Sequence, residues 1–461
     1  MNTNSTRVRP FFRWLAITCV IVLLPAAAHA LWDYVEMRRL ATAIDDLRQR
    51  GEPVSSAMLT RVRRPSSEEA MRAARYYNAG AALAFRDWVK TYPVANLPRD
   101  QAIERGRQVI VSIAKTRAIA PGALDALRTL ADEYADALQM VDRAADLPFT
   151  GFPPYFFEDN GRVFSLEDLT VPASARTFVE LASGNGAEAA ESLYRSIRLR
   201  RALTRSVPWI GLPLLDLQML VENTDVPAEG LAKLQSAFAE AERPDAVQQA
   251  VRENRANMIQ AVWARLYGKG ADANTPAGNI RVSWDPWNLS RPWIAREVRL
   301  GLAVQQQVLE AAERPWPEKL SELARLAPHL APEPPVAPKP GVDVRWFNDS
   351  FPWVYARDVA PAEARKLALT RAAGVVLAMA RYRQEHGALP EGLDRLVPEY
   401  LSEVPQDPFT GRGLLYVADA SRFVVYSTGD DATDDGGAVG QLAPGWPRHG
   451  AKDTGIEIRL R

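Results

Sequence analysis

Residues 362 to 387 read A-E-A-R-K-L-A-L-T-R-A-A-G-V-V-L-A-M-A-R-Y-R-Q-E-H-G, and this stretch decides the fold of the C-terminal part of the chain. Apolar residues recur in it at helical spacing, which predicts one helix from Ala362 to His386. Its apolar stripe consists of Leu369, Ala372, Ala373, Val376 and Ala380. Gly387 then supplies the left-handed residue at which many helices end.

A small sheet is predicted after this helix. Residues 389 to 401, L-P-E-G-L-D-R-L-V-P-E-Y-L, predict a short helical turn, and V-P-Q-D-P-F-T-G at residues 404 to 411 predicts a turn-rich crossing. Two strands follow, near Gly413 to Ala418 and near Arg422 to Ser427, joined by a short turn. We therefore expect residues 362–461 to form a small α+β domain, with the helix packed on an antiparallel sheet.

The order of these elements resembles a known family. The long helix, the proline-containing turn, V-P-Q-D-P-F-T-G, the two strands and Y-S-T-G-D-D-A-T-D-D-G-G at residues 426 to 437 resemble the C-terminal domain of the major (G-type) pseudopilin of type II secretion systems. The resemblance covers about residues 365 to 437, and the remainder resembles uncharacterised helical bacterial envelope proteins. Because the acidic loop of pseudopilins binds calcium, the resemblance implies a calcium site formed by Asp430, Asp431, Asp434 and Asp435.

The acidic loop also has a composition that suits calcium. D-D-A-T-D-D-G-G offers four carboxylates on a glycine-bearing loop, and calcium prefers several oxygen ligands on flexible backbone. Residues 403 to 437 hold seven acidic residues against two arginines, although the spacing is not that of an EF-hand. A solvated turn explains the same charges, so calcium binding and a solvated turn are the two alternatives.

The N-terminus predicts insertion into a membrane. Arg7, Arg9 and Arg13 precede a run from Trp14 to Trp32 without a charged residue, and this asymmetry keeps the arginines cytoplasmic. One interpretation is a signal anchor over residues 1–32, which makes the chain a single-pass inner-membrane protein with its bulk in the periplasm. The alternative is a signal peptide that is cleaved after Ala30, which releases the chain into the periplasm.

The chain between the anchor and the α+β domain is predicted to be helical. Residues 33–327 contain repeated amphipathic stretches without a regular 34-residue period, which favours an irregular α-helical array. Residues 328–361 are rich in proline and predict a linker, since proline propagates neither a helix nor a central strand. The predicted fold class is therefore mainly α, with a transmembrane or signal helix, a helical array and a small α+β domain.

Aromatic clusters interrupt the helical region and leave a second interpretation open. The segments at residues 147 to 157 and 283 to 294 are more apolar than solvated loops, so they either line a ligand groove or pack between helices. Glu158, Asp159 and Asp168 follow the first segment. Two carboxylates facing each other across an aromatic cleft would indicate a periplasmic carboxylate-dependent hydrolase or a carbohydrate-binding protein.

Composition and motifs exclude several classes of function. Lys plus Arg equals Asp plus Glu at 56 each, so the chain lacks the basic excess of a nucleic-acid-binding protein. The single cysteine, Cys19, excludes disulfides and thiolate zinc sites. Nucleophile and phosphate-loop motifs do not occur in the sequence. We therefore predict a non-enzymatic, membrane-anchored extracytoplasmic protein with protein partners in the bacterial envelope or its secretion machinery.

Overall fold

A computed structural model describes residues 8–55, 58–59, 67–91, 98–148, 166–203, 211–242, 246–267, 291–330, 359–440 and 453–460. The described chain is mainly helical, with an apolar N-terminal helix and a small antiparallel sheet near the C-terminus, and this confirms the predicted class at that level. The chain divides into two compact units. Unit 1 comprises Met1–Val62, Val251–Glu310 and Pro328–Trp353, and unit 2 comprises Arg63–Ala250, Ala311–Ala327 and Val354–Arg461.

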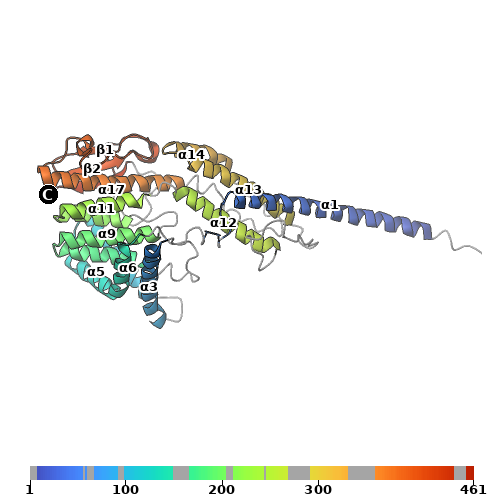
Figure 1. The fold of residues 1–461 in the computed structure, drawn as a ribbon, viewed down its shortest axis with the longest axis horizontal. Helices are drawn as coiled ribbons and strands as arrows, with labels where there is room; N and C mark the ends of the chain where they lie inside the picture. The colour runs from blue at the N-terminus through green and yellow to red at the C-terminus, as the bar shows by residue number, and fades with distance from the viewer. Residues whose placement is uncertain are drawn as a thin grey trace, which may run out of the picture. The chain divides into compact units, whose positions relative to one another are not determined.

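The elements are labelled in Figure 1. The helices are α1 (Val8–Gln49), α3 (Glu68–Thr91), α4 (Pro98–Thr116), α5 (Pro121–Glu133), α6 (Ala135–Ala145), α8 (Thr170–Ala182), α9 (Gly186–Leu203), α10 (Gly211–Asn223), α11 (Ala228–Ala241), α12 (Ala246–Tyr267), α13 (Arg291–Ala312), α14 (Glu318–Leu330) and α17 (Ala360–His386). The 3-10 turns are η3 (Leu393–Leu396) and η4 (Gly429–Asp431), and the strands are β1 (Leu415–Ala418), β2 (Arg422–Ser427) and β3 (Thr454–Arg459).

Unit 2 is a stack of helices that ends on the sheet. Helix α3 packs on α6, α8 packs on α5 and α9, and α11 packs on both α9 and α17. Figure 1 shows α9, α11 and α17 side by side, with β1 and β2 on the far side of α17. Alanine and glycine allow the close approach of α3 to α6, since a Cβ on Gly80 would lie 3.1 Å from the carbonyl of Ala137. One continuous hydrophobic core runs from this helical stack to the sheet.

Helix α17 carries the C-terminal part as predicted. It begins two residues earlier than expected, at Ala360, and it ends at Gly387, whose φ of 72° is left-handed. The main-chain N–H of Gly387 donates to the carbonyl of Arg383 at 2.8 Å. More of the helix is buried than the predicted stripe, because α11 covers one side while β2 and β3 cover another. The double covering explains four additional core residues, which are Val375, Leu377, Ala378 and Met379.

The sheet has three antiparallel strands in the order β1-β2-β3. The two predicted strands form the β1–β2 hairpin, with Leu415 opposite Tyr426. Strand β3 was not predicted, although T-G-I-E-I-R alternates as a half-buried strand should. Its Ile456 and Ile458 are buried against α17 and complete the core.

Unit 1 is built around the second half of α1. Leu40, Ile44 and Leu47 recur at helical spacing and are buried, and they pack with apolar residues of α12 and α13 that include Trp263 and Val298. Ion pairs surround this small core. They include Asp33 with Arg291, Glu36 with Arg299, and Glu52 with the fully buried Arg255.

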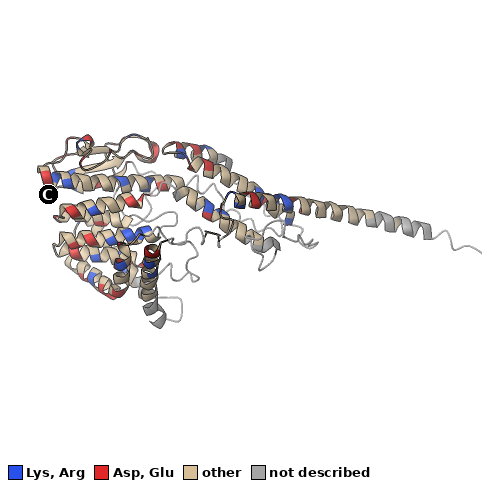
Figure 2. Cartoon of the chain, in the orientation of Figure 1, with Lys and Arg blue, Asp and Glu red and all other residues tan. Residues whose placement is uncertain are grey.

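The first half of α1 is apolar and exposed. Val20, Ile21, Val22, Leu23 and Leu24 are each more than half exposed. Figure 2 shows no charged residue along the described part of this segment. Within the described residues, one helix is long and apolar enough to cross a membrane, and it is this one. A membrane span and a signal sequence both fit this observation.

Candidate functional site

The four predicted calcium ligands lie in the loop after β2, where they make different contacts. Asp430 forms an ion pair with Arg365 of α17, with oxygen to nitrogen distances of 2.9 and 2.6 Å. Asp431 accepts from the main-chain N–H of Thr433 at 3.0 Å, which closes a turn. The structure therefore gives these two aspartates roles in holding the loop.

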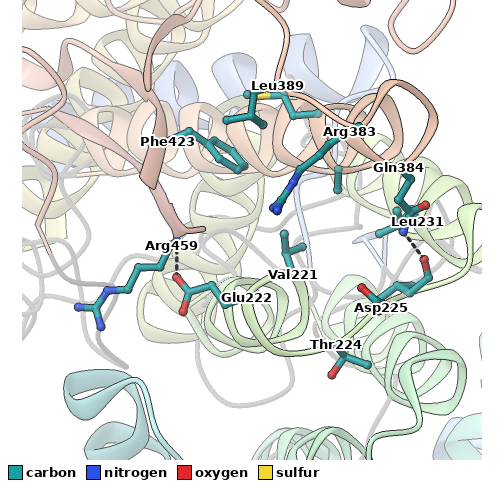
Figure 3. Close-up of a pocket in the computed structure, with 14 residues that line it drawn as sticks. Val221, Glu222, Thr224, Asp225, Leu231, Arg383, Gln384, Leu389, Phe423 and Arg459 are labelled. Atoms are coloured by element: carbon teal, nitrogen blue, oxygen red, sulfur yellow. Dashed lines mark hydrogen bonds between the residues drawn. The ribbon is translucent and has the colours of Figure 1, made fainter. Parts of the chain in front are cut away.

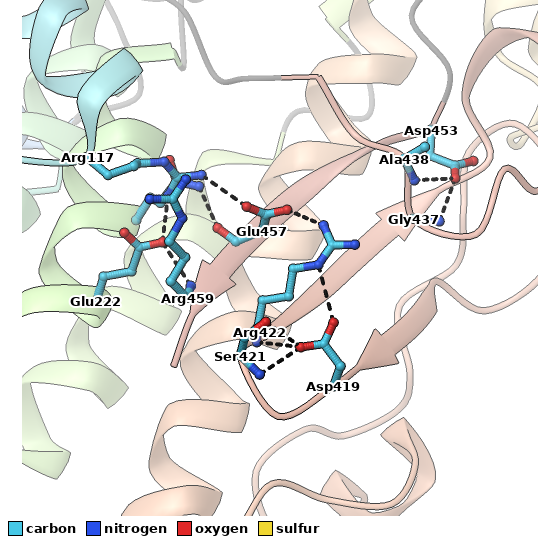
Figure 4. Close-up of polar contacts among 11 residues, drawn as sticks. Arg117, Glu222, Asp419, Ser421, Arg422, Gly437, Ala438, Asp453, Glu457 and Arg459 are labelled. Atoms are coloured by element: carbon cyan, nitrogen blue, oxygen red, sulfur yellow. Dashed lines mark hydrogen bonds and ion pairs between the residues drawn. The ribbon is translucent and has the colours of Figure 1, made fainter. Parts of the chain in front are cut away.

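The second half of the loop gathers carboxylates around a residue that sequence analysis missed. Asp434 accepts from the hydroxyl of Tyr426 at 2.9 Å, and the main-chain N–H of Asp435 donates to Asp453 at 3.3 Å. Asp453 is buried and also accepts from Gly437 at 2.8 Å, which Figure 4 shows. Burial raises the pKa of Asp453, and the nearby charge of Asp434 adds to this effect.

These contacts decide how well the loop suits calcium. Asp434 and Asp453 are hard oxygen acceptors with like charges, which a cation would stabilise, whereas Asp430 is already paired. Within the described residues, no group of three or more acidic, histidine or cysteine side chains is arranged to hold a metal. The four-residue calcium site stays a prediction. The strand pattern directly after Asp453 was the one local signal for this residue, and the sequence analysis did not use it.

The V-P-Q-D-P-F-T-G motif has a structural explanation. The carboxylate of Asp407 is buried and accepts from the main-chain N–H of Phe409 at 2.9 Å. It also accepts from the hydroxyl of Ser427 at 2.7 Å and from the main-chain N–H of Thr428 at 3.2 Å. These bonds tie the crossing to the end of β2. The aspartate of the motif is therefore a folding residue, which fixes where the acidic loop begins.

A cavity of about 500 Å³ lies in unit 2 between the helical stack and the sheet. Its size falls within the range of small-ligand pockets. Its apolar walls include Val221, Leu231, Leu389 and Phe423, and its polar lining includes Glu222, Asp225, Arg383, Gln384 and Arg459. The lining comes from α10, α11, α17, β2 and β3, so the pocket exists only because α17 packs on α11.

The charges of this pocket are unevenly compensated. Arg383, in the last turn of α17, extends its guanidinium toward the space between Phe423 and Val221 (Figure 3). Among the described residues its guanidinium has no hydrogen-bond or ion-pair partner, and the same holds for the carboxylate of Asp225. The pocket thus combines apolar walls with an arginine and an aspartate whose side chains have no partner in the described part of the chain.

Glu222, in contrast, is buried and paired through one of its carboxylate oxygens. Its carboxylate accepts from the side chain of Arg117 at 2.6 Å and from the main-chain N–H of Arg459 at 2.9 Å. Burial raises the pKa of Glu222, while the bond from Arg459 and the charge of Arg117 oppose that rise. Glu222 therefore fastens β3 to α10, whereas Arg383 and Asp225 contribute charges to the pocket that no described residue pairs.

A chain of ion pairs continues from Glu222 across the sheet (Figure 4). Arg117 also lies 3.7 Å from Glu457 of β3, and Glu457 pairs in turn with Arg422 of β2. Arg422 then pairs with Asp419, which caps the β1–β2 turn by accepting from the main-chain N–H of Ser421 at 2.7 Å. The network joins the end of α4 to two strands that follow it much later in the chain.

A second buried polar group lies inside the helical stack. Asp216 of α10 is fully buried and accepts from the hydroxyl of Ser174 at 2.6 Å. Burial raises the pKa of Asp216 to about 7, although the Ser174 bond and the charge of Arg200 act in the opposite direction. These residues do not line the pocket, so we interpret the group as part of the core.

The carboxylate cleft considered as an alternative lies mostly outside the described residues. Glu158, Asp159, Trp284 and Trp287 are all outside the described residues. Most of the predicted linker is outside as well, although its first residues, up to Leu330, belong to α14. Asp168 is half-buried just before α8. Of the three tryptophans in the second aromatic segment, Trp293 is described, and its side chain is 42% exposed. The hydrolase interpretation stays a prediction.

Comparison of this chain with models of protein families, with curated proteins and with solved structures found no match.

Proposed function

We propose that this chain is a non-enzymatic, single-pass protein of the bacterial inner membrane, with a cytoplasmic N-terminus and a periplasmic bulk. In this proposal it serves as an interaction or assembly component of the envelope or its secretion machinery, and its α+β part is a pseudopilin-like head. The exposed apolar half of α1 supports the anchor, since Arg7, Arg9 and Arg13 precede it. The order of α17, the hairpin and the acidic loop supports the pseudopilin-like head.

The pocket that contains Arg383 is the observation that carries this proposal. The guanidinium of Arg383, which no described residue pairs, lies in a pocket with Phe423, Leu231 and Val221 and suits a partner segment with a carboxylate beside an apolar side chain. Asp225 at the same pocket suits a donor group on that segment. Polypeptides offer both groups together, so we propose a protein partner.

Photo-crosslinking in living cells tests this binding. A photoreactive amino acid in place of Thr224, which lines the pocket, should give a discrete adduct with an envelope protein. Arg383→Glu should abolish the adduct because it reverses the charge that the partner meets. Arg395→Glu is the matched control, since Arg395 is an exposed arginine outside the pocket, and it should leave the adduct intact. An adduct that survives Arg383→Glu would contradict the proposed binding.

The anchor and the cleaved signal peptide are distinguished by the mass of the mature protein. A retained anchor leaves the chain intact in the membrane fraction and accessible to protease from the periplasmic side. Cleavage after Ala30 removes the apolar segment and moves the protein to the soluble periplasm. The second outcome would refute the proposed inner-membrane localisation and leave the proposed binding untouched.

Calcium binding by the acidic loop is proposed as part of the same head. Ligand binding to the native state raises stability by RT ln(1 + [L]/Kd), so a site of about 10 μM contributes about 2.7 kcal/mol at about 1 mM calcium. A calcium-dependent rise in the melting temperature, relative to EDTA, should be lost in Asp434→Asn and Asp435→Asn. Glu399→Gln, an exposed acidic residue of the same head, should retain it. No rise in the wild-type protein would leave the loop as a solvated turn.

A further inference from the structure

The beginning of α13 lies beside the end of the apolar segment of α1. The rings of Trp293 and Trp32 are 5.8 Å apart with an interplanar angle of 79°, an edge-to-face contact. The residues from Trp14 to Trp32 span about 28 Å as a helix, close to the thickness of a bilayer's hydrocarbon core. If that run crosses the bilayer, Trp32 lies at the edge of the hydrocarbon and Trp293 lies at the same depth.

Exposed aromatic and basic residues are paired in the same way on both helices. On α13, Arg296 lies over the ring of Trp293 at 5.8 Å, and on α1, Arg38 lies over the ring of Tyr34 at 5.9 Å. Trp293 and Tyr34 are 42% and 52% exposed. Each arginine follows its aromatic residue by about one helical turn. Tryptophan and tyrosine favour the membrane interface, and arginine beside them reaches the lipid phosphates.

Ion pairs neutralise most of the negative charge beside Trp293 and Tyr34. Asp33 and Glu36 are both buried, and they pair with Arg291 and Arg299 of α13. Glu297 is the exposed acid beside Arg296. The same two ion pairs set the direction of α13, because residues 33 and 36 on α1 meet residues 291 and 299 in the same order. Helix α13 therefore runs away from the apolar segment, and its first turn is the part closest to it.

We propose that the first turn of α13 is a second membrane-contacting element, seated in the headgroup layer of the bilayer that α1 crosses. Trp293 lies at the boundary with the hydrocarbon, and Arg296 binds lipid phosphates. This inference rests on the anchoring of α1 that we propose above. In addition to the anchor, the first turn of α13 then holds unit 1 against the membrane surface.

Fluorescence quenching of the full-length protein in nanodiscs of phosphatidylethanolamine and phosphatidylglycerol tests this inference. In a Cys19→Ala background, an NBD fluorophore is attached at Val22→Cys, at Arg296→Cys or at Gln307→Cys. All three native side chains belong to helices, and Arg296 and Gln307 are both exposed on α13. Nanodiscs then carry a nitroxide either on the lipid headgroup or on the acyl chain.

We expect the headgroup nitroxide to cause loss of emission at position 296 and not at position 307. The acyl-chain nitroxide should cause loss of emission at position 22. Equal emission at positions 296 and 307, with quenching at position 22, would overturn the seating of α13 and leave the anchor intact. Unquenched emission at position 22 would refute the anchor itself, and the seating of α13 with it.

Discussion

Arg117 should be a main determinant of how the sheet is held on the helical stack. Its guanidinium lies between Glu222 of α10 and Glu457 of β3, and its side chain is 8% exposed. Its backbone is also unusual, with a φ of 55° directly after the end of α4. Left-handed backbone is costly for a residue with a Cβ, so the ion pairs stabilise a position that the backbone alone disfavours.

The magnitude follows from the burial of the partners. Removing one member of a buried ion pair costs about 3 to 5 kcal/mol, because it leaves the other charge uncompensated. Arg117→Ala should therefore lower the free energy of unfolding by about 3 kcal/mol. Arg117→Gly removes the same charge but relaxes the left-handed backbone, at some entropic cost in the unfolded chain. It should be less destabilised than Arg117→Ala by about 0.5 to 1 kcal/mol.

Equilibrium urea unfolding of the full-length protein in nonionic detergent measures these differences. The control is Arg128→Ala on α5, which removes an exposed ion pair with Asp125 and should cost less than about 0.5 kcal/mol. The double variant Arg117→Ala with Glu222→Gln should recover part of the loss, because no unpaired charge then remains buried.

The pH dependence provides an independent check of the same reasoning. Burial already raises the pKa of Glu222, and loss of Arg117 should raise it further. When the pKa of a carboxyl group is raised in the folded state, the protein loses stability as the pH rises through that pKa. The deficit of Arg117→Ala should therefore shrink at acidic pH, where Glu222 is protonated. If Arg117→Ala costs no more than Arg128→Ala, or if its deficit is independent of pH, the network does not hold the sheet.

Three further substitutions test the packing of unit 2. Because its pKa is raised, ionisation of Asp216 should lower the free energy of unfolding between about pH 4 and about pH 7, by at most about 1.4 kcal/mol per pH unit. Asp216→Asn should reduce this fall, which urea titrations at several pH values measure. Gly455→Ala should destabilise by about 3 kcal/mol, because its Cβ would lie 2.3 Å from the carbonyl of Val425, and the loss of β2–β3 pairing should appear in amide exchange. Gly374→Ala, with nothing within 4 Å of its Cβ, should instead stabilise α17 by about 0.5 to 1 kcal/mol in the same unfolding assay.

Local pattern was sufficient for most of the elements and for the apolar N-terminal segment. The helix at residues 362–386, the hairpin strands and the uncharged run from Trp14 to Trp32 all follow from periodicity and composition within one short window. The burial of Leu40 and Ile44 follows in the same way. These features depend on neighbouring residues along the chain, so the sequence by itself determined them. Strand β3 was readable too, from the alternation of T-G-I-E-I-R, but it was missed.

Tertiary structure alone decided which polar residues meet. Arg117 and Glu222 are 105 positions apart, and Glu222 and the backbone of Arg459 are 237 positions apart. No local pattern marks such partners, because an ion pair depends on where packing brings two backbones and not on spacing along the chain. For the same reason, two aspartates of one acidic loop have different surroundings. Asp430 pairs with Arg365, whereas Asp434 lies near Asp453. The pocket around Arg383 likewise exists only because α17 packs between α11 and the sheet, since α10 and α11 are far from α17, β2 and β3 along the chain.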